Sequence, residues 1–122
     1  MSSSVMWGDI FLYLPPPEFV RDYAFQERPV LVVSPDELMD ESYFMCVPFY
    51  SQRLESRRAQ GNCVAFVKGE CGLSKDCVAK CDELQRYQVT ELDFRRGKIG
   101  SLSPDKFAPI ANAILHKSLP KP

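Results

Sequence analysis

The chain has 122 residues, and its 15 lysines and arginines against 16 aspartates and glutamates give a formal net charge of −1. Hydrophobic residues make up 45% and charged residues 25%, which is typical of a soluble globular protein and excludes a disordered or collagen-like chain. This balance excludes a globally basic nucleic-acid binder, although not a local basic groove. No apolar run approaches the roughly 18 residues that span a membrane. We therefore expect one cytoplasmic domain over 1–122, with no membrane partner.

The first half of the chain predicts three strands. After a loose tail over 1–5, the apolar stretch Met6–Leu14 predicts the first strand. Pro29–Ser34 is a continuous, valine-rich run, typical of a strand buried on both faces. Tyr43–Tyr50 predicts the third strand, and Pro48 indicates that it is an edge strand or ends there, because proline cannot donate to a sheet ladder. Loops are expected to connect these strands, over 15–27 and 36–41.

The second half predicts two further strands after a polar, arginine-rich loop over 51–61. In Asn62–Lys68, Cys63, Ala65 and Val67 alternate with Val64 and Phe66, which predicts a strand. Asp76–Leu84 predicts another strand. On that strand, Lys80 and Asp82 would share one face because successive side chains alternate.

The chain closes with a predicted helix that begins at Ser103-Pro104, an N-cap followed by proline at the first helical position. Pro109 either kinks this helix or marks the start of its regular part. A set of apolar residues recurs at helical spacing and predicts the buried face: Phe107, Ile110, Ala111, Ile114 and Leu115. Five or six short strands before one helix favour a small, mainly β fold, a strongly bent antiparallel barrel with a C-terminal helix over 6–118.

The five cysteines are an odd number and include no C-x-x-C pair. On an extended strand Cys77 and Cys81 would be about 13 Å apart, too far to share one metal ion. The only histidine, His116, is distant in sequence. The pattern therefore favours free thiols that act as small hydrophobic residues in a reducing compartment over a zinc site, and no metal is expected.

The concentrated basic patch of the chain consists of Arg53, Arg57 and Arg58, with Lys68 following. Guanidinium groups bind phosphates in a bidentate manner, so this patch is a candidate RNA-binding or phosphate-binding site. The alternative is a solvated loop that Glu55 partly neutralises.

Further candidates for chemistry lie at predicted strand ends. Lys80 and Asp82 form either an acid/base pair or a surface ion pair of little energetic value. Tyr50 and Ser51 supply two hydroxyls, but without an adjacent base Ser51 is a poor nucleophile, and such residues are also common turn formers. Arg28 directly precedes the buried valine strand and is expected to line a groove.

Taken in order, four stretches resemble the MazF/PemK/Kid toxins of bacterial type II toxin–antitoxin systems. They are Gly8–Phe11 (GDIF), Arg28–Pro35 (RPVLVVSP), Val47–Ser51 (VPFYS) and Cys77–Asp82 (CVAKCD). Lys98-Ile99-Gly100 and the terminal helix complete a resemblance over about residues 6–118. It implies a small SH3-like barrel of five to seven strands, usually a homodimer.

The resemblance also implies an endoribonuclease that cleaves single-stranded RNA without metal or cofactor and is blocked by a cognate antitoxin. A ribose 2′-hydroxyl would attack the adjacent phosphate. Lys80-Cys81-Asp82 matches an Arg-Cys-Asp stretch of the Kid-like branch, so Asp82 would be the base and Lys80 the acid or an electrostatic stabiliser. Arg28 matches the family arginine and would hold the scissile phosphate.

The chain departs from the family pattern at its expected site. Tyr50 precedes Ser51 where relatives have a catalytic threonine, and Lys80 replaces an arginine, which removes the bidentate fork. The first loop holds no histidine. The alternative function is therefore a catalytically inactive SH3-like barrel that binds a protein or nucleic-acid partner through the same groove.

Overall fold

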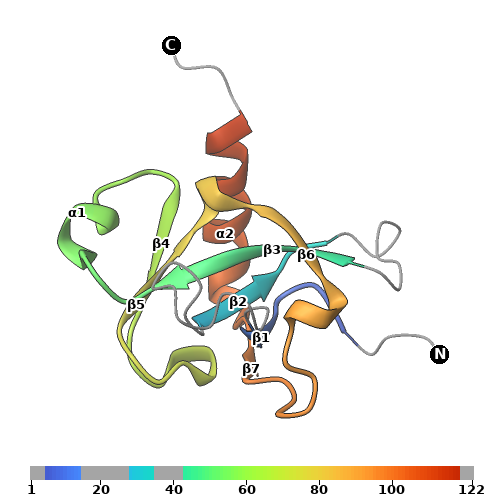
Figure 1. The fold of residues 1–122 in the computed structure, drawn as a ribbon. Helices are drawn as coiled ribbons and strands as arrows, with labels where there is room; N and C mark the ends of the chain where they lie inside the picture. The colour runs from blue at the N-terminus through green and yellow to red at the C-terminus, as the bar shows by residue number, and fades with distance from the viewer. Residues whose placement is uncertain (1–4, 15–27, 35–42, 119–122) are drawn as a thin grey trace.

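Seven antiparallel strands form one curled sheet in the order β4-β5-β3-β2-β1-β7, with β6 paired to the first half of β3 (Figure 1). This computed structural model describes residues 5–14, 28–34 and 43–118. The strands are β1 Asp9–Tyr13, β2 Arg28–Val32, β3 Tyr43–Tyr50, β4 Cys63–Phe66, β5 Cys77–Lys80, β6 Gln85–Gln88 and β7 Gly100–Ser101. The mainly β fold with a C-terminal helix is confirmed. The predicted connections 15–27 and 36–41 lie outside the described residues.

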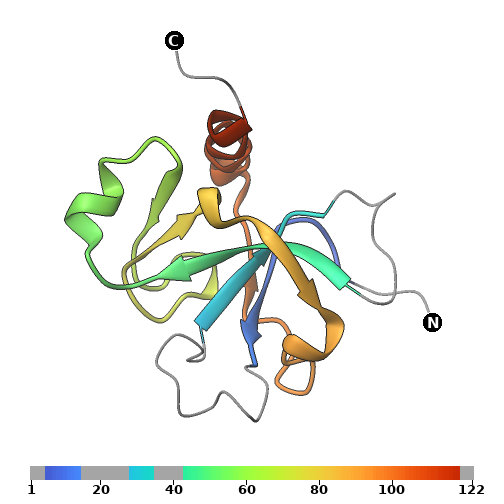
Figure 2. The same cartoon turned by 45° about the horizontal axis from the view of Figure 1, so that its top comes forward.

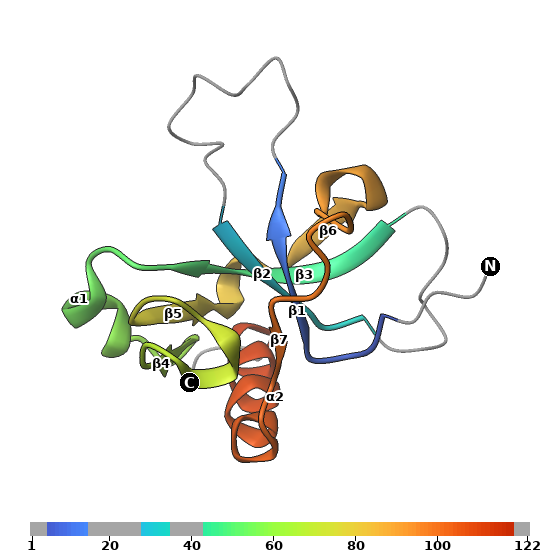
Figure 3. The ribbon, with the colours of Figure 1, turned by 90° about the horizontal axis from the view of Figure 1, so that it is seen from below.

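The described residues also form two α-helices and three 3-10 turns, and α2 follows the last strand. The helices are α1 Leu54–Arg58 and α2 Pro104–Ser118, and the turns are η4 Glu70–Gly72, η5 Cys81–Glu83 and η6 Val89–Glu91. Helix α2 lies against one side of the sheet and contacts β4 and η5 (Figures 1 and 3). Within the described part of the chain, no helix has the length and apolar character to cross a membrane.

Strand β3 is a central strand, so the edge position inferred from Pro48 is wrong. One side of β3 pairs with β2, where Val30 stands opposite Pro48. The other side pairs with β6 as far as Cys46 and with β5 from Phe49 onward (Figure 2). Pro48 lies in the gap where β3 changes partner on this side, so no ladder donor is required of it.

Strand β2 and the residue after it are buried on both faces, as the valine-rich run predicted. Leu31 and Val33 belong to the core beneath α2, together with Phe66 and Ile110. Val30 and Val32 point to a second core with residues of β1, β3 and β6. The second core contains Phe11, Tyr13, Phe44, Cys46, Tyr87 and Leu92.

Helix α2 is continuous through Pro109, so this proline does not mark its start. Pro109 has no N–H, so the carbonyl of Asp105, four residues earlier, has no intrahelical donor. Because Pro109 is exposed, that carbonyl can bind water instead. The predicted apolar face is partly wrong. Ile110 is buried, but Phe107 and Leu115 are exposed, and Ala113 packs in the core instead.

The strand predicted over Asp76–Leu84 is also interrupted. Strand β5 ends at Lys80, the chain turns through η5, and β6 follows. The predicted polar loop over 51–61 contains the short helix α1. The predicted alternation in β4 is confirmed, because Val64 and Phe66 are buried and Ala65 is exposed.

All five cysteines lie in the described part and are free, and three of them are buried. Burial raises the pKa of Cys46 and Cys81 to about 12 and that of Cys77 to about 11. Because these folded pKa values lie above the ordinary value of 9.0, the contribution of these three thiols to stability is fully present below pH 9 and is lost as the pH rises toward 11–12.

We expect at most two thiols of the native protein, Cys63 and Cys71, to react rapidly with a disulfide reagent at pH 8. All five should react in denaturant. The measurement is the absorbance of the released thiolate against time, with Cys63→Ala and Cys71→Ala each removing one rapid equivalent. More than two rapid equivalents in the native protein would contradict the burial of Cys46, Cys77 and Cys81.

Candidate active site

Two arginines from different elements converge on Tyr50, at the end of β3. The guanidinium carbon of Arg28 lies 4.5 Å from the centre of the Tyr50 ring, and that of Arg57 lies 4.4 Å from it. Val30 stands opposite Pro48 in the antiparallel pair. Arg28 lies two residues before Val30 and Tyr50 two residues after Pro48, so the two side chains stand opposite each other on one face of the β2–β3 pair. Helix α1 brings Arg57 to the same ring. The aromatic ring therefore contacts two cations that come from different elements of the fold.

An ion-pair network continues from Tyr50 into η5. The Tyr50 hydroxyl donates a hydrogen bond to Glu83 Oε1. Lys80 Nζ lies 3.1 Å from Glu83 Oε2 and 2.7 Å from Asp82 Oδ2. Because a 3-10 turn brings residues three apart onto the same side, η5 returns Glu83 to Lys80 at the end of β5.

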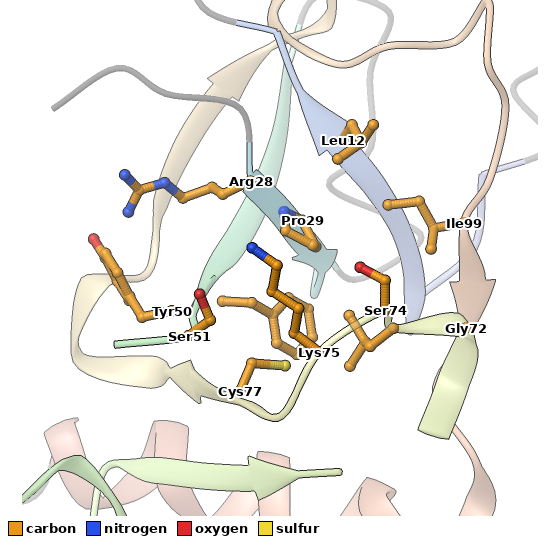
Figure 4. Close-up of a pocket in the computed structure, with 12 residues that line it drawn as sticks. Leu12, Arg28, Pro29, Tyr50, Ser51, Gly72, Ser74, Lys75, Cys77 and Ile99 are labelled. Atoms are coloured by element: carbon orange, nitrogen blue, oxygen red, sulfur yellow. The ribbon is translucent and has the colours of Figure 1, made fainter. Parts of the chain in front are cut away.

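Two cavities adjoin this network and share Arg28 and Tyr50. The larger, of about 370 Å³, is bordered by Ser51, Ser74 and Lys75 above an apolar floor (Figure 4). The smaller, of about 180 Å³, is lined by Gln85, Arg86, Tyr87 and Glu91, among others. The arrangement can hold an anion on the arginines with a ligand group on either side.

A sequence profile identifies the family. The profile described as "PemK-like, MazF-like toxin of type II toxin-antitoxin system" matches residues 7–117. The chain belongs to this toxin family. A search of curated proteins finds no match.

Solved structures of MazF-like toxins share the fold. A mycobacterial endoribonuclease in complex with its cognate antitoxin is 18% identical, with a TM-score of 0.69 over 98% of this chain and 100% of that chain. The Mycobacterium tuberculosis toxin MazF-mt6 is 20% identical, with a TM-score of 0.64 over 88% of this chain and 95% of that chain. A further mycobacterial endoribonuclease is 18% identical, with a TM-score of 0.69 over 100% of this chain and 99% of that chain. These likenesses establish the MazF-like fold.

Several residues singled out in this MazF-like sequence lie together. Lys80 contacts Asp82, and Arg28 and Arg57 lie over Tyr50. Ser51 is exposed and borders the larger cavity. The other basic candidates lie outside the network: Arg53 and Arg58 are exposed at the two ends of α1, and Lys68 is exposed beyond the far end of β4.

Sequence reasoning missed Glu83. An unbroken strand would place Glu83 on the face opposite Lys80, because side chains alternate. The turn at η5 instead brings Glu83 to the same side as Lys80. The one feature of the sequence that could have indicated a break in the strand is Leu84, whose apolar side chain interrupts a polar stretch, but Leu84 by itself does not indicate a 3-10 turn.

Burial and charge set the protonation of the network. The hydrogen bond with Asp82 is the largest cause that raises the pKa of Lys80. Burial, followed by the hydrogen bond to Glu83, raises the pKa of Tyr50 against the opposing effect of both arginines. A raised pKa means that the proton is held more tightly, so at neutral pH Lys80 is a cation and Tyr50 a neutral phenol.

Among residues 5–14, 28–34 and 43–118, no three or more histidine, cysteine, aspartate or glutamate side chains are placed to hold a metal ion together. The oxygens of Asp82 and Glu83 that lie nearest the network are directed to Lys80 and Tyr50 instead.

Proposed function

We propose that this chain is a toxin that cleaves single-stranded RNA, including mRNA, without a metal ion, by attack of a ribose 2′-hydroxyl on the adjacent phosphate. The observation that carries the proposal is the continuous network of Arg28, Tyr50, Glu83, Lys80 and Asp82 beside two cavities. Membership of the MazF-like family and the endoribonuclease relatives support it.

In this proposal, Arg28 and Arg57 bind the non-bridging oxygens of the scissile phosphate. Their stacking on Tyr50 reduces the side-chain freedom lost when phosphate binds. Charge grows on these oxygens in the phosphorane-like transition state, and fixed cations stabilise that charge without reorganisation. Lys80 adds a third positive charge nearby, held in place by Asp82 and Glu83, and acts electrostatically.

Asp82 is the proposed base. Its Oδ2 binds Lys80, whereas its buried Oδ1 has no hydrogen-bond partner among the described residues. An unsatisfied buried oxygen costs about 1–3 kcal/mol. The Asp82 side chain as a whole is 29% exposed, so we propose that a small rotation of the carboxylate presents this oxygen to the 2′-hydroxyl and relieves that cost. Asp82 takes the hydroxyl proton as the 2′-oxygen bonds to phosphorus.

Tyr50 is the proposed acid. The bond from phosphorus to the 5′-oxygen breaks, and the phenol donates its proton to that oxygen, with both arginines beside the resulting phenolate. The products are a 2′,3′-cyclic phosphate and a 5′-hydroxyl. Water then returns a proton to Tyr50, and Glu83 orients its hydroxyl for the next reaction.

The family membership extends the proposal to partners. We propose a cytoplasmic homodimer that a cognate antitoxin inhibits, as in the mycobacterial complex to which the fold is similar. Arg53, Arg58, Lys68 and Ser51 would contact the RNA outside the reacting phosphate.

The test is cleavage of a mixed single-stranded RNA in EDTA by the purified protein. We expect the wild type to leave cyclic-phosphate ends and Arg28→Ala to lose about 10²–10³-fold in rate, because it removes a phosphate-binding cation. Arg95→Ala, an exposed arginine outside both cavities, is the matched control and should cut at the wild-type rate. If the wild type neither cuts nor binds RNA, the chain is better explained as a barrel that binds another partner.

A further inference from the structure

The two cavities beside Arg28 differ in chemistry, and this difference bears on which RNA sequence is cut. We call the larger the Lys75 pocket and the smaller the Glu91 pocket, each after a charged residue that it contains and the other lacks. Arg28 and Tyr50 line both. A phosphate on Arg28 therefore lies between the pockets, and the nucleotides on its two sides can enter different ones. The inference rests on the proposed function.

The Lys75 pocket presents hydrogen-bond donors around an apolar floor. Lys75, Ser51 and Ser74 supply its ammonium and hydroxyl groups (Figure 4). Its described lining contains no carboxylate. The floor is formed by Leu12, Pro29, Phe49, Leu73 and Ile99, with the Cys77 thiol. A flat base that buries its faces on this floor is held best if its edge carries carbonyl acceptors.

The Glu91 pocket presents a carboxylate in a polar setting that also contains Arg86, whose guanidinium carbon lies 4.7 Å from the centre of the Tyr43 ring. Glu91 Oε1 accepts the backbone N–H of Gln88 at 2.8 Å, which fixes the carboxylate in place. Gln85 Nε2 donates to the Tyr87 hydroxyl at 3.2 Å, so its amide and this hydroxyl are likewise oriented. A fixed carboxylate accepts from an exocyclic amino group and repels a carbonyl oxygen.

We propose that the two pockets read the two bases that flank the scissile phosphate. The Lys75 pocket takes a base with a keto oxygen at C6 or C4, guanine or uracil. The Glu91 pocket takes a base with an amino group at C6 or C4, adenine or cytosine. The cut therefore falls between a keto base and an amino base, and Arg28 holds the phosphate between them.

The test is the cleavage profile of a randomised single-stranded RNA, read by sequencing the new ends, for the wild type and two variants. Lys75→Met keeps the length of the side chain and removes its charge. Glu91→Gln keeps the reciprocal cap with Gln88, because glutamine also fits a capping box, but replaces a carboxylate with an amide that can donate. Arg95→Gln and Glu55→Gln are matched controls that lie outside both pockets.

We expect Lys75→Met to reduce keto preference at one flanking position, and Glu91→Gln to reduce amino preference at the other, each by about ten- to a hundredfold. Lys75→Met should leave the amino preference unchanged, and Glu91→Gln should leave the keto preference unchanged. Both control variants should retain the wild-type profile. Profiles that show no base selection at the two positions, or that neither variant alters, would overturn the assignment.

A second measurement separates this inference from the proposed function. Binding of 2′-O-methyl hexanucleotides, which lack the attacking hydroxyl, is measured for the four keto/amino combinations at the central step. Suppose that the wild type cleaves no RNA but binds the keto–amino combination most tightly, and that Lys75→Met and Glu91→Gln weaken this preference. The assignment of the two pockets then holds, and the proposed RNA cleavage fails. If the wild type neither cleaves nor discriminates among these RNAs, both proposals fail.

Discussion

Asp82→Asn is expected to lower RNA cleavage by about 10²–10⁴-fold, the range for loss of a positioned general base. The amide has nearly the same shape and can still present its oxygen to Lys80, which now binds Asp82 Oδ2 at 2.7 Å. It cannot take a proton from the 2′-hydroxyl. RNA binding should change much less than the rate, because the phosphate rests on Arg28 and Arg57 rather than on Asp82. The measurement is single-turnover cleavage beside RNA binding by the same variant.

Two matched variants make this result interpretable. Asp105→Asn changes an exposed aspartate in the first turn of α2 and should cleave at close to the wild-type rate. Glu83→Gln tests the neighbouring carboxylate, which positions Tyr50 and Lys80. If Glu83→Gln is inactive while Asp82→Asn cuts normally, Glu83 is the base and the role given to Asp82 is wrong.

Gly100→Ala is expected to destabilise the fold by about 3 kcal/mol or more, the upper range for overpacking. A Cβ at this position would lie 2.0 Å from the backbone oxygen of Cys71, which cannot move away as a flexible side chain would. The contact joins β7 to η4, where Gly72 in turn approaches the Ile99 carbonyl. Urea unfolding of the variant beside the wild type measures the loss.

Gly97→Ala is the control for Gly100→Ala. Gly97 has φ +81° and meets no described atom within 4 Å, so alanine there carries only the backbone cost of about 1–2 kcal/mol. Equal stability losses at the two positions would show that the close approach of β7 to η4 does not matter. Because Gly72, Leu73 and Ile99 line the Lys75 pocket, a Gly100→Ala protein that folds should also show weakened keto selection.

The strands were predictable because their signals are local. Valine-rich and alternating runs predicted β2 and β4, and the double-sided burial of Val30–Val33 followed from an unbroken apolar run. The helix boundary at Pro104 was predictable from the Ser103-Pro104 cap. The buried face of α2 was predicted only in part, because Phe107 is exposed and packs edge-on with Trp7, at 5.2 Å between ring centres, rather than in the core.

The residue types of the candidate site could be singled out from the sequence, whereas the contacts that join them could not. Arg28, Tyr50, Lys80 and Asp82 were singled out from strand ends and charge, and the ordered stretches pointed to the family. The role of Pro48 was missed because a proline tolerated at a change of strand partner looks, in sequence, like a proline at an edge.

Composition, local periodicity and the four ordered stretches therefore determined the fold class, most strands and the toxin family, since each depends on residues near one another in the chain. Tertiary structure alone decided that Arg57 stacks on Tyr50, that Glu83 joins Lys80 to Tyr50, and that Arg28 separates two pockets of different chemistry. The physical reason is that these contacts join β2, β3, β5 and α1 through the curl of the sheet and the turn at η5. Neither the curl nor that turn has a periodic signal in the sequence.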